Sequence, residues 1–353
     1  MRRPLVNYPS EEDMKNAQKV ARSRGRLGDR MLDRYYTAIL GHAIGDALGV
    51  PVEFMSREAL TREPVCEMMG YGTYPVPAGS WSDDTSMVLA TLDSLRGGKV
   101  DYDAMMQNFV LWVKENKYTP TDMLFDIGGT TSQAIENYLL NGDATSSGLA
   151  DAYSNGNGSL MRILPVALYL FARRTPKKEA MEIIDKVSCL THAHPRSRIA
   201  CGIFAFVLWE LLRNPTKDSV RVGLAKARAY YADEEELKVY DVRLMKRIGR
   251  VLCEGEREEE FAPLALSEIK SSGYVVDTLE AVIWCIMTTN NYKNCVLTAV
   301  NLGEDTDTIG AIAGSLAAVL YGYEALPAPW IDTLQRRDYI ESLCLDTFES
   351  WRE

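Results

Sequence analysis

The segment PAGSWSDDT occupies residues 77–85 and ends a stretch that is rich in turn-forming residues. Behind it, apolar residues recur at helical spacing, at Met87, Val88, Leu89, Leu92 and Leu95. We therefore expect a helix to begin near Ser82, whose hydroxyl can cap free backbone N–H groups, while Asp83 and Asp84 offset the positive end of the helix dipole. Taken alone, this segment indicates no more than a well-capped helix.

A second acidic helix start lies far away in the chain, where NLGEDTDT at residues 301–308 precedes a small-residue helix expected over residues 309–321. Asp305, Asp307 and Thr308 offer oxygen ligands, and acids this dense repel one another unless a cation lies between them. Mg²⁺ and Mn²⁺ prefer such oxygens. If the two helix starts converge, their four carboxylates and two hydroxyls can hold two metal ions about 4 Å apart.

Helical periodicity also runs through residues 102–113, 127–139 and 276–286. Alternating strands flanked by hairpin turns are not evident in the sequence. We therefore predict an all-α fold of about a dozen helices joined by loops, forming a compact domain with its metal site at helix N-termini.

A glycine-rich helix is expected over residues 39–48, and it breaks before Pro51. Each glycine inside a helix costs about 1 kcal/mol relative to alanine, so the repeated glycines indicate close contact with another backbone. Asp46 in this helix is interpreted as a buried, hydrogen-bonded structural acid. Glu53, on the loop beyond the break, is better placed for chemistry.

Two further loops have the composition of ligand sites. The segment NGNGS at residues 155–159 precedes an expected helix over residues 160–171, and such helix starts bind anions through free amides, although a plain turn has the same composition. The segment THAHP at residues 191–195 holds two of the three histidines. No Cys or Glu follows at a zinc-site spacing, so a helix boundary is favoured there.

The bulk composition restricts the possible classes of protein. Of 353 residues, 46% are hydrophobic, and no apolar stretch has the length of a signal peptide or a membrane span, which predicts a cytosolic protein. The seven cysteines are odd in number and contain no CxxC pair, which indicates reduced, buried thiols. A net charge of −10 argues against general binding to nucleic acid.

Together these segments resemble the ADP-ribosylglycohydrolase family, which includes enzymes that reverse the ADP-ribosylation of dinitrogen reductase and the arginine- and serine-type ADP-ribosyl hydrolases. The resemblance runs in the family's order from about residue 33 to residue 325. Its motifs are GDALG at 45–49 with Glu53, GSWSDDT at 79–85, DIG at 126–128 with TT at 130–131, GNGSLMR at 156–162, TH at 191–192 and DTDTIG at 305–310.

The resemblance implies a compact all-α hydrolase with two Mg²⁺ ions, or Mn²⁺ in some members. Its metal ligands match Ser82, Asp83, Asp84, Asp305, Asp307 and Thr308. Several relatives have threonine in place of Ser82, and serine keeps the hydroxyl. By the same resemblance, the ribose and diphosphate are held by residues matching Gly156, Asn157, Gly158, Ser159, Leu160 and His192.

The implied reaction cleaves the ribosyl C1″ bond through an oxocarbenium-like state that carboxylates stabilise. Glu53 is the expected general base or water-orienting acid, and Asp84 or Asp126 can share that role. Asp126 matches an acid of the arginine-type enzymes, so release of ADP-ribose from arginine on a modified protein is the leading hypothesis. The alternatives are serine, O-acetyl-ADP-ribose or nucleic-acid linkages, and a non-catalytic, crystallin-like binding protein on the same fold.

The first residues differ in charge from the rest of the chain. Residues 1–30 contain eight basic and four acidic residues, a net charge of +4, and Ser10 begins a possible capped helix. We predict a basic extension over residues 1–32 before an ADP-ribosylglycohydrolase domain over residues 33–353. Because one branch of the family provides immunity to ADP-ribosylating toxins, residues 1–30 are a candidate arm for binding a cognate ADP-ribosyltransferase. A surface-docked leader with no separate task is the alternative.

Overall fold

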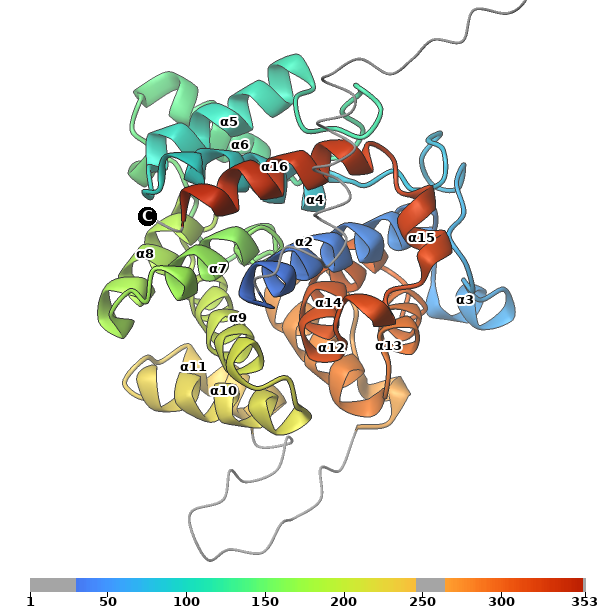
Figure 1. Cartoon of the computed structure of the whole chain (residues 1–353). Helices are drawn as coiled ribbons and strands as arrows, with labels where there is room; N and C mark the ends of the chain where they lie inside the picture. Colours follow the sequence, from blue (N-terminus) through green and yellow to red (C-terminus); the bar gives the residue numbers. More distant parts are fainter. Residues whose placement is uncertain (1–29, 246–263, 352–353) are drawn as a thin grey trace, which may run out of the picture.

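Two glycine-containing helices meet at the centre of the fold. In the computed structural model, which describes residues 30–245 and 264–351, helix α2 (Arg30–Gly49) lies against helix α14 (Thr306–Tyr321) (Figure 1). A Cβ atom added to Gly45 would lie 2.0 Å from the carbonyl oxygen of Gly310, and one added to Gly314 would lie 2.3 Å from that of Gly41. The two backbones are therefore in direct contact, as the glycine spacing of residues 41–49 predicts.

The remaining helices surround this central pair. In chain order they are η1 (Val50–Val52), α3 (Arg57–Arg62), α4 (Asp83–Ser94), η2 (Leu95–Gly97), α5 (Tyr102–Glu115), α6 (Gly129–Asn141), η3 (Ala144–Ser146), α7 (Leu164–Ala172), α8 (Lys177–Cys189), α9 (Pro195–Arg213), α10 (Lys217–Tyr230), α11 (Leu237–Tyr240), η4 (Asp241–Met245), η5 (Leu266–Glu268), α12 (Val275–Thr288), α13 (Tyr292–Val300), η6 (Tyr323–Ala325), α15 (Ala328–Thr333) and α16 (Arg337–Ser350).

Each neighbouring helix buries an apolar face against this centre. Helices α12 and α13 pack on α14, α4 packs between α2 and α5, and α9 contacts α7, α8, α10 and α12. On α5, the side chains that the periodicity assigns to the core, such as Phe109 and Trp112, are fully buried. The all-α prediction is confirmed for residues 30–245 and 264–351, where the only β-type pairing is two isolated bridges.

One predicted helix start is wrong. The helix expected from residue 160 begins instead at Leu164, and residues 159–162 form turns. Pro165 stands at the first turn of α7, where a missing N–H is tolerated and the fixed φ suits a helix start. The glycine loop at residues 155–159 is therefore separated from the N-terminus of α7 and does not use the free amides of that helix.

Several sequence features lie outside the described residues. These are the extension up to residue 29, with its Ser10 helix start, the acidic run at residues 254–260 and Cys253. Residues 30–32 of the predicted extension belong to α2. Cys66 is exposed, in contrast to the prediction, whereas Cys201, Cys285, Cys295 and Cys344 are buried free thiols. No helix of the described ranges is long and apolar enough to cross a membrane.

Candidate active site

Asp46 of α2 holds the start of α4 in place. Its Oδ1 accepts hydrogen bonds from the backbone N–H and the hydroxyl of Ser82, at 2.9 and 3.0 Å, and its Oδ2 accepts from those of Thr85, at 2.9 and 2.6 Å. The Ser82 hydroxyl in turn accepts from the backbone N–H of Asp84 at 3.3 Å, so that it caps α4 as predicted. The interpretation of Asp46 as a buried, hydrogen-bonded acid is confirmed.

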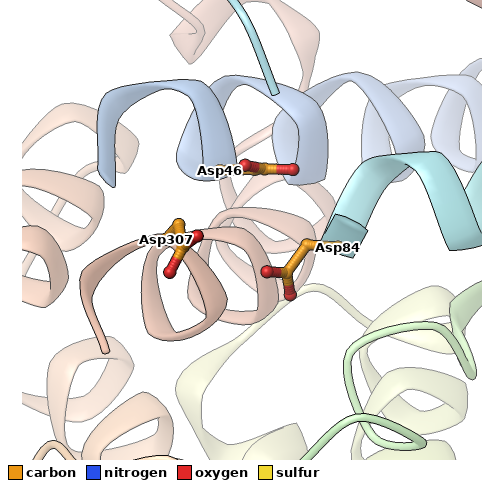
Figure 2. Close-up of side chains that lie close together, drawn as sticks. All are labelled: Asp46, Asp84 and Asp307. Atoms are coloured by element: carbon orange, nitrogen blue, oxygen red, sulfur yellow. The ribbon is translucent and has the colours of Figure 1, made fainter. Parts of the chain in front are cut away.

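The two acidic helix starts converge. Figure 2 shows Asp84 at the start of α4 and Asp307 in the first turn of α14, next to Asp46 on α2, and oxygen atoms of the three residues lie within 4.8 Å of one another. The hydroxyl of Thr308 donates to Oδ2 of Asp84 at 3.1 Å across the two helix starts. Residues more than two hundred positions apart in the chain thus form one cluster.

A second group of acids adjoins the first. Oxygens of Glu53, Asp305 and Asp307 also lie within 4.8 Å of one another. The side-chain amide of Asn157 donates to Oδ2 of Asp305 at 2.6 Å, which connects the glycine loop to the cluster. Asp307 belongs to both groups and therefore lies between them.

Asp83 faces a different loop. It belongs to neither of these two groups, and its Oδ2 accepts from the backbone N–H of Gly128 at 3.4 Å. Asp126 lies next to Asp83, since each of these carboxyl groups influences the pKa of the other. The loop before α6 therefore brings Asp126 to the edge of the cluster.

Burial makes the cluster acidic groups hard to ionise on their own. Desolvation, followed by the charges of neighbouring carboxylates, raises the pKa of Asp84 and of Asp307 well above the usual range. Burial and the charge of Asp126 raise the pKa of Glu53 to about 8. A bound cation would favour the ionised forms of all these groups.

The donor set fits a hard divalent cation. All the converging side chains present carboxylate or hydroxyl oxygens, and Oδ1 of Asp84 is buried without a hydrogen-bond partner in the described residues. Asp46 differs from them, because each of its oxygens already accepts two hydrogen bonds from the start of α4. Asp46 therefore orients the start of α4, while Oδ1 of Asp84 is free of hydrogen bonds from the described residues and could bind a metal.

Tyr74 is a site residue that sequence reasoning missed. Its hydroxyl donates to Oε2 of Glu53 at 2.7 Å, and its ring lies 4.9 Å from that of Phe125, the residue before Asp126. Tyr74 thus connects the two loops that carry Glu53 and Asp126. It stands in the turn-rich stretch before PAGSWSDDT, and nothing in its spacing distinguishes it from the other loop tyrosines.

The glycine loop reaches the cluster mainly through its first half. Gly156 and Gly158 lie against the ring of His192, which is within 3.6 Å of a Cβ position at either glycine. Ser159 and Leu160 are buried, and the Ser159 hydroxyl accepts a hydrogen bond from that of Ser188 at 2.9 Å. The side chains of Ser159 and Leu160 are thus buried in the protein interior. Gly156 and Gly158 lie against His192, and Asn157 is the residue of this loop that contacts an acid of the cluster, Asp305.

His192 is a neutral hydrogen-bonding group rather than a cation. Burial, with the nearby charge of Arg162, lowers the pKa of His192 to about 3. Its Nδ1 lies 2.9 Å from the Thr191 hydroxyl. The helix boundary predicted at THAHP is confirmed, because His194 caps α9 by accepting from the backbone N–H of Arg196.

Comparison with known proteins agrees with this geometry. The family model described as ADP-ribosylglycohydrolase matches residues 27–353. The chain belongs to the ADP-ribosylglycohydrolase family. The expected family, and with it an ADP-ribosyl hydrolase of the glycosidase class, is thereby confirmed.

Individual family members cover most of the chain. It is 33% identical over 320 residues to ADP-ribosylarginine hydrolase Tri1 of Serratia proteamaculans, covering 90% of this chain and 79% of that protein. It is 31% identical to ADP-ribosyl-[dinitrogen reductase] glycohydrolase of Rhodospirillum rubrum, covering 88% and 93%. A solved structure described as an ADP-ribosylglycohydrolase-related protein complex superimposes with a TM-score of 0.72 at 28% identity, covering 91% of this chain and 99% of that chain.

Proposed function

We propose that this protein hydrolyses the bond between C1″ of ADP-ribose and an arginine side chain of a modified protein. The observation that carries the proposal is the convergence of Asp84 and Asp307, at two helix starts, with the loop carboxylate Glu53. The choice of arginine rests on similarity to two proteins named ADP-ribosylarginine hydrolase Tri1, at 33% and 32% identity. Asp126 at the edge of the cluster is consistent with that choice.

In this proposal, two divalent cations, Mg²⁺ or Mn²⁺, are held at the two helix starts. The ligands are Ser82, Asp83, Asp84, Asp305, Asp307 and Thr308, all of which present oxygen atoms. When bound, the cations supply the positive charge that orients the ribose hydroxyls and makes water more acidic. The burial of Asp84 and Asp307 supports this assignment, because buried carboxylates remain ionised only beside compensating charge.

Glu53 is the proposed proton acceptor. As the C1″–N bond breaks and a C1″–O bond forms, water loses a proton to Glu53 and the leaving arginine nitrogen takes up a proton. Without cations, burial and the charge of Asp126 raise the pKa of Glu53 to about 8, and bound cations would lower it, so that Glu53 is ionised and can accept a proton near neutrality. The hydroxyl of Tyr74 holds one carboxylate oxygen of Glu53, which leaves the other oxygen for water. Asp84 and Asp126 are the remaining candidates for the same role.

The rest of ADP-ribose lies, in this proposal, along the glycine loop. The absent side chain of Gly158 makes room for the ring of His192, which lies 2.6 Å from a Cβ position there, and the ribose and diphosphate are proposed to bind along this backbone and the ring of His192. Asn157 connects this loop to Asp305 and so fixes its distance from the acids. The buried Ser159 and Leu160 contribute through the position of the backbone.

A substrate comparison tests the proposed function. The protein is incubated with arginine-linked ADP-ribosyl protein and with an ADP-ribosyl-serine peptide, each with Mg²⁺ and with a chelator, and released ADP-ribose is measured. We expect Mg²⁺-dependent release from arginine. Full turnover by metal-free protein contradicts the metal assignment, release from serine alone contradicts the linkage, and no release from either favours a non-catalytic binding protein.

We also propose that residues 1–30 bind a cognate ADP-ribosyltransferase while the body removes its product. The net charge of +4 of this segment, against −10 for the whole chain, supports a separate role for it. Deletion of residues 1–30 should then weaken binding to a transferase encoded nearby and leave hydrolysis of ADP-ribosylarginine unchanged. Equal binding by the truncated protein, or loss of hydrolysis, contradicts the assignment of transferase binding to residues 1–30 and of hydrolysis to the rest of the chain.

A further inference from the structure

The loops next to Glu53 contain two exposed aromatic residues whose backbone is in the left-handed conformation. Phe54 has φ +66° and is 70% exposed, and Tyr71 has φ +58° and is 74% exposed. The left-handed region is costly for bulky residues and persists where the surrounding structure enforces it, commonly at functional sites. Exposed large apolar side chains gathered in one place mark a binding surface.

Hydrogen bonds enforce the conformation of these two loops. The backbone N–H of Phe54 donates to the carbonyl oxygen of Glu304 at 2.7 Å, and the N–H of Glu304 donates to that of Met55 at 2.8 Å. The N–H of Thr73 donates to the carbonyl oxygen of Pro51 at 2.8 Å, and its hydroxyl donates to that of Glu53 at 2.7 Å. The loops that carry Phe54 and Tyr71 are therefore in contact with each other.

A third exposed apolar side chain belongs to the same region. Met123 is 46% exposed and follows Asp122, which has φ +56°. The loop of Met123 contacts the loop of Tyr71 through the rings of Phe125 and Tyr74. Phe54, Tyr71 and Met123, which we call the apolar rim, thus stand on three loops that meet around Glu53.

The position of the apolar rim indicates what covers it. The glycine loop meets the acids through Asp305, whereas the rim adjoins Glu53. ADP-ribose that lies along the glycine loop with C1″ at Glu53 directs the group attached to C1″ past Glu53. That group is the modified arginine, and the polypeptide that carries it must lie immediately outside the acidic cluster, on the side of Glu53 where the apolar rim stands.

The charge around the rim favours a basic polypeptide. Glu304, beside Phe54, is exposed, and the Asp122 side chain next to Met123 is 88% exposed with a single ion pair to Arg336 at 3.3 Å. Glu304 directly precedes Asp305 of the acidic cluster. Apolar side chains interspersed with carboxylates complement a segment that contains both apolar and cationic residues.

We propose that the apolar rim of Phe54, Tyr71 and Met123 docks the polypeptide that carries the ADP-ribosylated arginine, and that it selects segments with basic and apolar residues. This inference rests on the proposed function and adds to it the recognition of the acceptor. Free ADP-ribosylarginine, which has no polypeptide, cannot contact the apolar rim. Comparing its hydrolysis with that of an ADP-ribosylated peptide therefore distinguishes an effect on docking from an effect on bond cleavage.

The test compares kcat/KM for free ADP-ribosylarginine with that for a synthetic peptide in which ADP-ribosylarginine is flanked by lysine and leucine. Tyr71→Ser and Met123→Ser remove rim side chains that are 74% and 46% exposed. Leu140→Ser is the matched control, because Leu140 is 86% exposed and stands in the last turn of α6, roughly 16 Å along that helix from its start next to the Asp126 loop. We expect each rim variant to lower the peptide-to-free ratio of kcat/KM about five-fold or more.

Each outcome decides a separate point. A ratio within about two-fold of the wild type in every rim variant that folds, or an equal fall in Leu140→Ser, overturns the docking surface. The same fall measured with an acidic peptide overturns the preference for basic segments. Wild-type protein that hydrolyses neither substrate overturns the proposed function itself. Circular dichroism verifies folding, and since the two rim residues stand on different loops, one folded variant is sufficient for the test.

Discussion

Replacing Gly45 with alanine tests whether the contact of α2 with α14 positions the acidic cluster. A Cβ atom at this position would lie 2.0 Å from the carbonyl oxygen of Gly310, 2.5 Å from its carbon and 2.9 Å from the nitrogen of Ala311. All three atoms belong to the backbone of α14. No side chain can rotate away, so the two helices must separate.

The magnitude follows from two opposing effects. Helix propensity alone favours alanine over glycine by about 1 kcal/mol. Overpacking a well-packed core costs about 1–3 kcal/mol, and a backbone clash this close belongs at the upper end of that range. We therefore expect Gly45→Ala to destabilise the fold by about 2 kcal/mol. Because Asp46 is adjacent and Asp307 starts α14, separation of the helices should also weaken metal binding.

Urea denaturation followed by circular dichroism measures the free energy of unfolding, and the shift in Tm on adding Mg²⁺ measures metal binding. Gly97→Ala is the control, because the nearest atom to its added Cβ is 4.0 Å away and its φ is not positive. Wild-type stability in Gly45→Ala, or destabilisation with an unchanged Mg²⁺ shift, would refute the link between the helix contact and the site.

Four further predictions address the site directly. Asp305→Ala should keep the fold but lose both the activity and the rise in Tm on adding Mg²⁺, because the change removes a metal ligand from a rigid helix start. A rise in Tm equal to that of the wild type contradicts the metal assignment. Glu53→Gln should bind ADP-ribose normally and lower kcat about 10²–10⁴-fold, whereas lost binding with a normal kcat would make Glu53 a binding residue. Tyr74→Phe should lower kcat about ten-fold with little change in KM, since only the hydrogen bond to Glu53 is lost. An effect on KM alone would show that Tyr74 does not position the Glu53 carboxylate. Burial raises the pKa of Asp46 to about 6 and that of Glu53 to about 8, so the folded protein without metal binds more protons than the unfolded chain. Its free energy of unfolding should therefore fall as the pH rises from about 4 to 8. A urea midpoint in chelator that is higher at pH 8 than at pH 5 contradicts this prediction.

The parts of the site that follow from local chemistry were predictable. Ser82 is a good cap, and acids favour a first turn, so the start of α4 is evident in the segment from Ser82 to Asp84. The break after Gly49 follows from Pro51 in the same way. These features depend on residues within one or two helical turns of each other.

Other parts depend on long-range contacts. The start of α7 at Leu164 has a local signal, because Pro165 favours the first turn of a helix. The turns at residues 159–162, which replace the expected helix, depend on the burial of these residues in the core. The hydrogen bond from Tyr74 to Glu53 joins two irregular loops, in which no periodicity indicates which side chains face each other. The exposure of Cys66 likewise follows from the course of a loop.

By itself, the sequence determined the helices, the capped acidic start of α4, the second acidic helix start at Asp305 and Asp307, and the glycines that permit close packing, since capping, helical periodicity and the absence of a Cβ atom act locally. Only the tertiary structure decided that Asp84 and Asp307 share one cluster, that Asp46 holds the start of α4, and that Tyr74 reaches Glu53. The physical reason is the direct contact of α2 with α14, which brings segments far apart in the chain to within hydrogen-bonding distance, as in the bond from the Thr306 hydroxyl to the carbonyl oxygen of Gly49, and buries their charges together.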